Sequence, residues 1–157
     1  IVQATTQCWK CKKDIEVIGF GIENRFCAYE DRNDNNIRLV LESGEINIAS
    51  QIYNMPEKLQ RYLDKQYNYK MRYSKTIGEF CLSNGCRHCD SLQGNFYLFH
   101  EVDSPFWVDD ENEAKKLTLY RIKLPFDIPL DVSLGYSSTD YLFKQYSPVM
   151  DLDLEII

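Results

Sequence analysis

The sequence predicts an α+β fold built on an antiparallel sheet, with one or more short helices and a split zinc ribbon. Three observations carry this prediction. Short apolar-alternating runs separated by turn-forming residues recur along the chain, one stretch has helical periodicity, and two Cys-x2-Cys pairs lie far apart. With 157 residues, 44% of them hydrophobic, the chain can bury one core, so we expect a single domain over 1–157.

The first half of the chain reads mainly as strands. Extended runs are expected at 15–22, 25–30, 37–41 and 45–49, because each is short and rich in β-branched or aromatic residues. The Asn- and Asp-rich segment 31–36 predicts a loop between the second and third runs. Ser43 and Gly44 predict a hairpin between the third and fourth.

A helix is expected to start near Pro56 and to reach about Tyr67. Asn54 is a candidate cap, proline suits the first helical turn, and Glu57 complements the helix dipole. Apolar side chains then recur three and four residues apart, which predicts one buried stripe formed by Leu59, Tyr62, Leu63 and Tyr67.

The second half continues the mixed pattern. Extended chain is expected at 69–82, 95–101 and 117–124, and short helices at 109–113 and 138–146. The final run, 151–156, alternates with period two, which predicts a strand with one apolar and one acidic face.

Four of the six cysteines form the two pairs Cys8-Trp9-Lys10-Cys11 and Cys86-Arg87-His88-Cys89. A tetrahedral zinc ion takes four ligands, and two Cys-x2-Cys turns supply four sulfurs, so we predict one structural Zn²⁺ site from Cys8, Cys11, Cys86 and Cys89. The 74 intervening residues make segment 12–85 an insertion within the ribbon. Gly85 is expected to permit a tight backbone before Cys86. Cationic side chains flank the thiolates and offset their charge: Lys10, Lys12, Lys13, Arg87 and His88.

The competing interpretation of Cys8-Trp9-Lys10-Cys11 is a redox motif. Such a motif opens a helix after a buried strand, whereas here strand-like residues follow Cys11, and the second pair would be unexplained. The remaining cysteines, Cys27 and Cys81, are expected to be buried thiols.

These motifs resemble a group of uncharacterised bacterial proteins. That group carries C-W-K-C first and C-x-H-C-x3-Q-G-[DN]-aromatic later, matched here by 8–11 and 86–96. The resemblance covers residues 8 to about 106. It implies a split zinc ribbon and no established activity. Where the group usually has glycine after the last cysteine, this chain has Asp90.

Charge is distributed unevenly along the chain. Residues 1–100 carry 13 Lys and Arg against 12 Asp and Glu, whereas the C-terminal extension 101–157 carries 5 against 12. Proteins that bind duplex DNA usually present a strongly basic face, so this balance favours a protein partner. We therefore expect a non-enzymatic domain that binds another macromolecule.

Nucleic-acid binding is the alternative, because segment 61–75 interleaves tyrosines with cations. The candidate contacts are Arg61, Lys65, Lys70, Arg72 and Lys75. Strand geometry weakens this alternative, because Tyr69, Met71 and Tyr73 would share one face of a strand while Lys70 and Arg72 share the other. The simpler expectation places the tyrosines in the core and the cations in solvent.

A third hypothesis is a metal-dependent hydrolase that uses His100, Glu101 and Asp103. Adjacent strand residues point to opposite faces, so His100 and Glu101 would not converge there. Phe106 and Trp107 could belong to the core or to a partner contact. No apolar run is long enough to cross a bilayer, and no signal-peptide pattern follows Ile1, so we expect a cytoplasmic protein that does not enter membranes.

Overall fold

A computed structural model describes residues 1–23, 25–32 and 35–156, and it confirms the α+β prediction with a mainly antiparallel sheet. The strands are β1 (Val2–Gln7), β2 (Asp14–Glu23), β3 (Phe26–Arg32), β4 (Asn35–Leu41), β5 (Ile46–Ile52), β6 (Lys70–Ser74), β7 (Glu79–Ser83), β8 (Thr118–Arg121), β9 (Val132–Leu134) and β10 (Val149–Asp151). The helices are α1 (Glu57–Tyr67), α2 (Asn95–Phe99), α3 (Glu111–Lys115) and α4 (Tyr141–Tyr146).

Six strands form the main sheet in the order β10-β8-β1-β2-β5-β9. All neighbours are antiparallel except β8 and β10, which are parallel. Three of these strands come from the acidic segment 101–157, so the two ends of the chain meet in one sheet.

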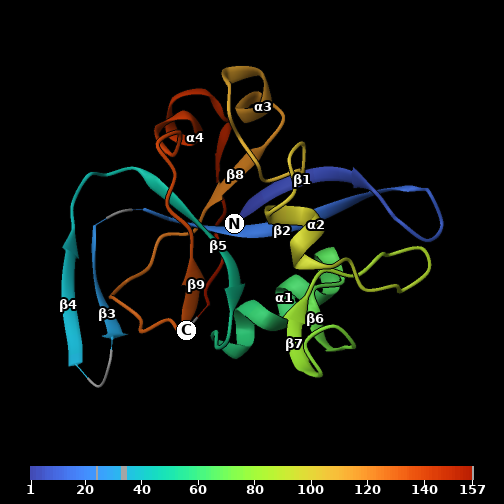
Figure 1. The fold of residues 1–157 in the computed structure, drawn as a ribbon, viewed down its shortest axis with the longest axis horizontal. Coiled ribbons are helices and arrows are strands. Elements are labelled where there is room, and N and C mark those ends of the chain that lie inside the picture. The colour runs from blue at the N-terminus through green and yellow to red at the C-terminus, as the bar shows by residue number, and fades with distance from the viewer. Residues whose placement is uncertain (24, 33–34, 157) are drawn as a thin grey trace.

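Two apolar clusters pack on opposite faces of β2, because its side chains alternate in direction. Ile15 and Val17 join the cluster that α3 and α4 cover, whereas Ile18 and Phe20 join the cluster under α1. Figure 1 shows α3 and α4 on one side of the sheet and α1 with the β6–β7 hairpin on the other. The predicted stripe of α1 is confirmed: Leu59, Leu63 and Tyr67 are buried, and Tyr62 is partly buried against the same cluster. Asn54 does not cap α1; its side chain accepts a hydrogen bond from the backbone of Asp131.

Two hairpins stand apart from the main sheet: β3 pairs with β4, and β6 pairs with β7. The predicted hairpin at Ser43 and Gly44 is wrong, because β4 pairs with β3 while β5 pairs with β2 and β9. Most of the predicted loop 31–36 extends the two strands instead, and its centre, 33–34, lies outside the described residues.

Residues 95–101 are helical at their start rather than extended, so that prediction is wrong. α2 follows Gly94, and its last turn buries Leu98 and Phe99 against the sheet. A five-residue apolar run fits a strand and a buried helical turn equally well, and only tertiary packing decides between them. The predicted strand 151–156 is wrong beyond its first residue: β10 covers Val149–Asp151, and residues 152–156 are not in a strand, although their burial still alternates as far as Ile156.

The two cysteines outside the pairs are not buried as predicted. Cys27 is exposed on β3, with its Sγ 3.3 Å from an Arg38 guanidinium nitrogen. Cys81 is half-buried, and its Sγ lies 3.1 Å from the Ser83 hydroxyl. Among the described residues, no helix has the length and apolar character that crossing a membrane requires.

Candidate metal centre

The two Cys-x2-Cys segments fold into loops with the same backbone pattern. The Cys8 N–H donates to the Lys13 carbonyl and the Lys12 N–H donates to the Cys8 carbonyl, at 2.9 and 3.0 Å. In the second loop the Cys86 N–H donates to Ser91 and the Asp90 N–H donates to Cys86, at 2.9 and 2.8 Å. Each loop is therefore a knuckle that presents two sulfurs on one side.

Both knuckles need a left-handed residue directly after the second cysteine. Lys12 has φ 61° and Asp90 has φ 57°, a region that favours glycine. This geometry is a physical reason why the resemblance leads us to expect glycine at position 90.

The knuckles bring the four cysteines together at one end of the sheet, where their loops lie side by side at the right of Figure 1. The four Sγ atoms all lie within 4.8 Å of one another. The Cys8–Cys89 and Cys11–Cys86 sulfur pairs are 3.8 and 3.6 Å apart. Zn–S bonds of about 2.3 Å in a tetrahedron place sulfurs roughly 3.8 Å apart, so the spacing fits a tetrahedral ion. The predicted metal ligands therefore form one candidate centre.

Polar groups close to the sulfurs stabilise their anionic forms. The Ser91 hydroxyl lies 3.4 Å from the Cys8 Sγ and 3.1 Å from the Cys89 Sγ, and the buried Gln93 amide donates to the Cys8 Sγ at 3.4 Å. Burial on its own would raise the pKa of Cys8. Hydrogen bonds from the Cys11 backbone and from Ser91 outweigh burial and lower that pKa to about 5.

Burial dominates at Cys86 and raises the pKa of its thiol, whereas hydrogen bonds from Ser91 lower the pKa of Cys89. Hydrogen bonds thus favour the thiolate at Cys8 and Cys89, whereas burial favours the protonated thiol at Cys86. Metal ligation requires the thiolate, so binding at this centre would release protons.

Each knuckle is also held by contacts from outside it. The Trp9 indole N–H donates to the Leu92 carbonyl at 2.8 Å and so joins the first knuckle to the second. The buried Asn84 side chain exchanges two hydrogen bonds of 2.8 Å with the backbone of Ile18 on β2.

Gly85 has a different role from the predicted one. It is not among the residues with positive φ, and it pairs with Leu92. A Cβ at Gly85 would overlap the guanidinium of Arg72, so glycine makes room for that side chain rather than for a tight turn.

The cations of segment 61–75 do not form one open basic surface. Arg61 pairs with Glu57, and Lys70 lies between Asp64 and Asp90. The Arg72 side chain is only 10% exposed and pairs with Asp90. Lys65 and Lys75 are exposed, on α1 and beside the β6–β7 turn.

The simpler expectation for this segment is confirmed for some residues and wrong for others. Tyr67 and Tyr69 are buried in the core, but Tyr73 is exposed and Arg72 is largely buried. Because Arg72 packs over Gly85, the face of β6 that carries cations turns inward.

The hydrolase candidates are not gathered into a site. Among the described residues, the four cysteines are the only group of three or more metal-ligand side chains close enough to hold an ion. His100 is exposed after α2, and its ring lies near the Phe96 and Phe99 rings. Phe106 belongs to the core, stacked on Phe99 at 4.6 Å between ring centroids, whereas Trp107 is 38% exposed.

Ser91 and Gln93 are the site residues that sequence reasoning from ligand spacing did not assign. Gln93 belongs to the Q-G-[DN] part of the second cysteine motif, and this was the sequence feature that could have identified it as a site residue. Arg87, which was expected to offset the charge of the thiolates, donates instead to the Gln66 carbonyl and pairs with Glu16.

No family model, no curated protein sequence and no solved structure matches the chain. The resemblance to bacterial zinc-ribbon proteins therefore remains an expectation from the motifs.

Proposed function

We propose that this chain is a zinc-stabilised domain that binds a protein partner through the exposed face of the β6–β7 hairpin. Zn²⁺ is the ion expected for four thiolates in a tetrahedral arrangement. Four protein ligands leave no open position for water or substrate, which favours a structural role over a catalytic one.

The observation that carries the proposal is an exposed aromatic pair. Tyr73 and Phe80 face each other across the hairpin, with ring centroids 5.3 Å apart in an edge-to-face arrangement. They are 52% and 68% exposed, and exposed Met71 and Ile77 flank them. We call Met71, Tyr73, Ile77 and Phe80 the hairpin face.

An exposed cluster of this kind is typical of an interaction surface, because aromatic residues and methionine are enriched where proteins bind each other. The hairpin continues directly into the second knuckle through Ser83 and Asn84, so the metal centre would fix its position. The net charge of −6 and the expected cytoplasmic location are compatible with a protein partner.

The test compares the proteins that co-purify with the wild-type chain and with a Tyr73→Ser/Phe80→Ser variant. We expect the variant to lose specific partners that a Phe126→Ser control retains, since Phe126 is an exposed aromatic outside the hairpin. If the same proteins remain bound to all three forms at equal yield, the hairpin face is not the binding surface.

Nucleic-acid binding stays as the second candidate because bases could stack on Tyr73 and Phe80 beside exposed Lys75. Fluorescence anisotropy with a single-stranded RNA oligomer at several salt concentrations separates the two. Affinity that falls with salt and with Lys75→Ala would favour this candidate. Arg72→Ala is unsuitable as the probe, because Arg72 supports the second knuckle.

A further inference from the structure

Strand β1 has an outer edge that is covered for only part of its length. β8 pairs with Val2 and Gln3, and beyond them no described strand lies against that side of β1. The Ile1 amine donates to the Tyr120 carbonyl and the Tyr120 N–H donates to the Ile1 carbonyl, both at 2.8 Å. This exchange fixes the direction of the backbone groups along β1.

Antiparallel ladders alternate, so every second residue of β1 directs its N–H and C=O toward β8. Those residues are Gln3, Thr5 and Gln7, in register with Ile1 just before the strand, and of these Thr5 and Gln7 lie past the end of β8. Among the described residues, no hydrogen bond outside the sheet ladders involves the Thr5 backbone. Thr5 therefore presents an unpaired donor and acceptor at a sheet edge.

The neighbouring strand shows how the fold treats an equivalent gap. β5 pairs with β2 only from Phe20 onward, and Ile18 lies past its end. There the Asn84 side chain supplies the donor and the acceptor that a strand would have supplied. No described side chain does this for Thr5, so the edge at Thr5 is left open.

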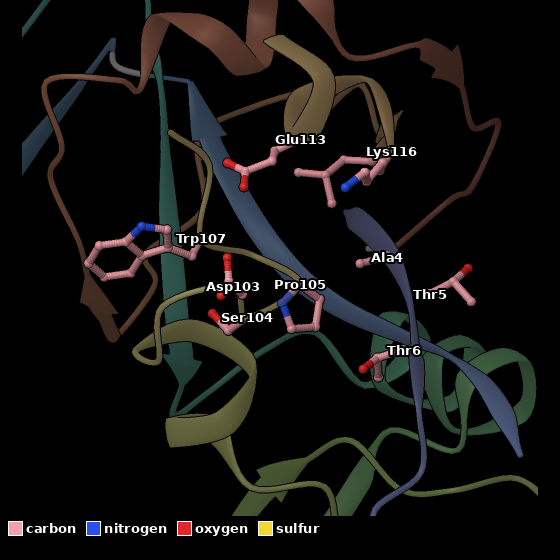
Figure 2. A pocket seen from close by; sticks show the side chains of 10 residues that line it. Ala4, Thr5, Thr6, Asp103, Ser104, Pro105, Trp107, Glu113 and Lys116 are labelled. Carbon is pink, nitrogen blue, oxygen red and sulfur yellow. The ribbon is translucent and has the colours of Figure 1, made fainter. Parts of the chain in front are cut away.

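A pocket of about 380 Å³ adjoins this open edge. Figure 2 shows β1 on one side of it, with loop 103–107 and the α3 region around it. The Ala4 and Thr6 side chains lie on the side of β1 toward Pro105, and the Thr5 side chain points the other way. Thr5 thus lines the pocket through its backbone.

The pocket walls combine apolar side chains with an excess of carboxylates. Pro105 and Leu117 contribute apolar surface, Asp103 and Glu113 contribute carboxylates, and Lys116 contributes the only ammonium group among the lining residues. One Glu113 carboxylate oxygen also accepts from the Asp109 N–H at 2.7 Å. The Ser104 hydroxyl in the wall is buried and has no hydrogen-bond partner. The walls therefore suit an occupant with apolar and basic groups.

We propose that an extended basic segment of another polypeptide binds here as an added strand, antiparallel to β1 and in line with β8. The residue opposite Thr5 exchanges two backbone hydrogen bonds with it, as in other cases of strand addition. The residues on either side of that one direct their side chains toward the Ala4 and Thr6 face, where Asp103 and Glu113 meet basic groups.

A second copy of this chain is a poorer occupant. β1 itself, Val-Gln-Ala-Thr-Thr-Gln, carries no basic residue, so edge-to-edge pairing of two copies would leave the carboxylates unmatched. This site is separate from the hairpin face and does not depend on the function proposed above.

The test uses ¹⁵N-labelled full chain in its metal-loaded form and two capped pentapeptides, Val-Lys-Val-Lys-Val and Val-Glu-Val-Glu-Val. Titration with the lysine peptide is expected to shift the Thr5 amide signal and to slow its hydrogen exchange, whereas the glutamate peptide has little effect. Binding should weaken as salt rises and in an Asp103→Asn/Glu113→Gln variant, because both reduce the charge attraction.

Thr5→Pro removes the outward N–H, and proline is tolerated where a strand's N–H does not bond a neighbour. We expect this variant to fold and to bind the lysine peptide about tenfold more weakly, given the loss of one backbone hydrogen bond. Thr5→Val, which keeps the backbone donor, should bind like the wild type. Thr6→Pro should destabilise the fold, because the Thr6 N–H faces β2.

Three results would overturn the proposal: unchanged binding in folded Thr5→Pro, equal binding of the two peptides, or Thr5 exchange unaffected by the lysine peptide. A Thr5 amide already protected in a concentration-dependent manner would assign the edge to a second copy instead. The exchange measurement decides the matter even if Thr5→Pro fails to fold.

Discussion

The Arg72 guanidinium lies 2.8 Å from the Asp90 carboxylate, and this ion pair joins strand β6 to the second metal knuckle. Arg72 also donates to the Asp90 and Asn68 carbonyls at 3.0 and 3.2 Å. The Asn68 amide donates to the same carboxylate at 2.9 Å. These contacts stabilise Asp90 in the left-handed conformation, which is uncommon for a non-glycine residue.

Arg72→Met is expected to destabilise the folded, metal-loaded protein by about 1–3 kcal/mol. The change keeps the length of the side chain but removes charged hydrogen bonds at a largely buried position. Chemical denaturation monitored by circular dichroism measures the loss. Arg61→Met serves as the control, because its ion pair with Glu57 is exposed and should contribute little.

A second variant distinguishes loss of the ion pair from a nonspecific effect on β6. Gly85→Ala introduces a Cβ into the space of the Arg72 guanidinium and should break the same contacts. The two substitutions then act on one interaction, so their effects on the free energy of unfolding should be non-additive. Full additivity would show that Gly85→Ala does not act through the contacts of Arg72.

Metal removal is expected to unfold the domain. Structural zinc sites contribute on the order of 10–16 kcal/mol in isolated peptides, which matches or exceeds the net stability of about 5–15 kcal/mol typical of a domain. Cys86→Ser should abolish stoichiometric zinc in metal analysis and remove the cooperative thermal transition. Cys27→Ser is the matched control, because Cys27 is exposed and outside the cluster.

A chelator should reproduce the Cys86→Ser result in the wild-type chain. If the chelated protein keeps its transition at the same temperature, the four-cysteine cluster is not what stabilises the fold.

The Asp140 carboxyl provides a pH-dependent prediction away from the metal centre. Burial raises its pKa, although hydrogen bonds from the Ser137 N–H and the Asn47 amide act in the opposite direction. Because the folded pKa lies above the unfolded value, the Asp140 carboxyl contributes its full stabilisation only below the unfolded pKa of about 3.9. This contribution is lost as pH rises through the folded pKa.

Asp140→Asn keeps an acceptor oxygen at this position and removes the titration. The difference in unfolding free energy, variant minus wild type, should therefore increase as pH rises from about 4 and then level off. Denaturation of both proteins at matched pH values measures this difference, in which acid effects on the metal centre cancel. A difference that stays constant or decreases with pH would contradict the raised pKa.

Local sequence patterns predicted the features that local chemistry decides. The ligand set follows from the two Cys-x2-Cys spacings, and α1 follows from its apolar stripe. Strand β1 was missed because Thr5, Thr6 and Gln7 give it a polar composition, while its position inside the sheet comes from pairing with distant strands.

The orientation of β6 shows a second limit. Alternation correctly places Tyr73 and Arg72 on opposite faces of β6. It does not say which face turns inward. That depends on Gly85, twelve or more residues away, which has no side chain and so leaves room for Arg72. Likewise, the open edge at Thr5 depends on where β8 ends, which no pattern within β1 reveals.

Asn84 links the second knuckle to the sheet, and its replacement is expected to be costly. Its side chain accepts from the Ile18 N–H and donates to the Ile18 carbonyl, and all of these groups are buried. Asn84→Ala leaves both backbone groups unpaired, at about 1–3 kcal/mol each, so a total loss of about 2–6 kcal/mol is expected. Asn84→Asp should be at least as harmful, because the carboxylate cannot donate to the Ile18 carbonyl and brings a charge into a buried position.

Amide exchange provides the specific readout for this contact. The Ile18 N–H should exchange faster in Asn84→Ala by more than the global loss of stability explains, since its acceptor is removed. Zinc content should stay near one ion per chain under native conditions, because the four sulfurs remain. Exchange of Ile18 that follows only the global stability would show that solvent or a rearranged neighbour replaces the asparagine.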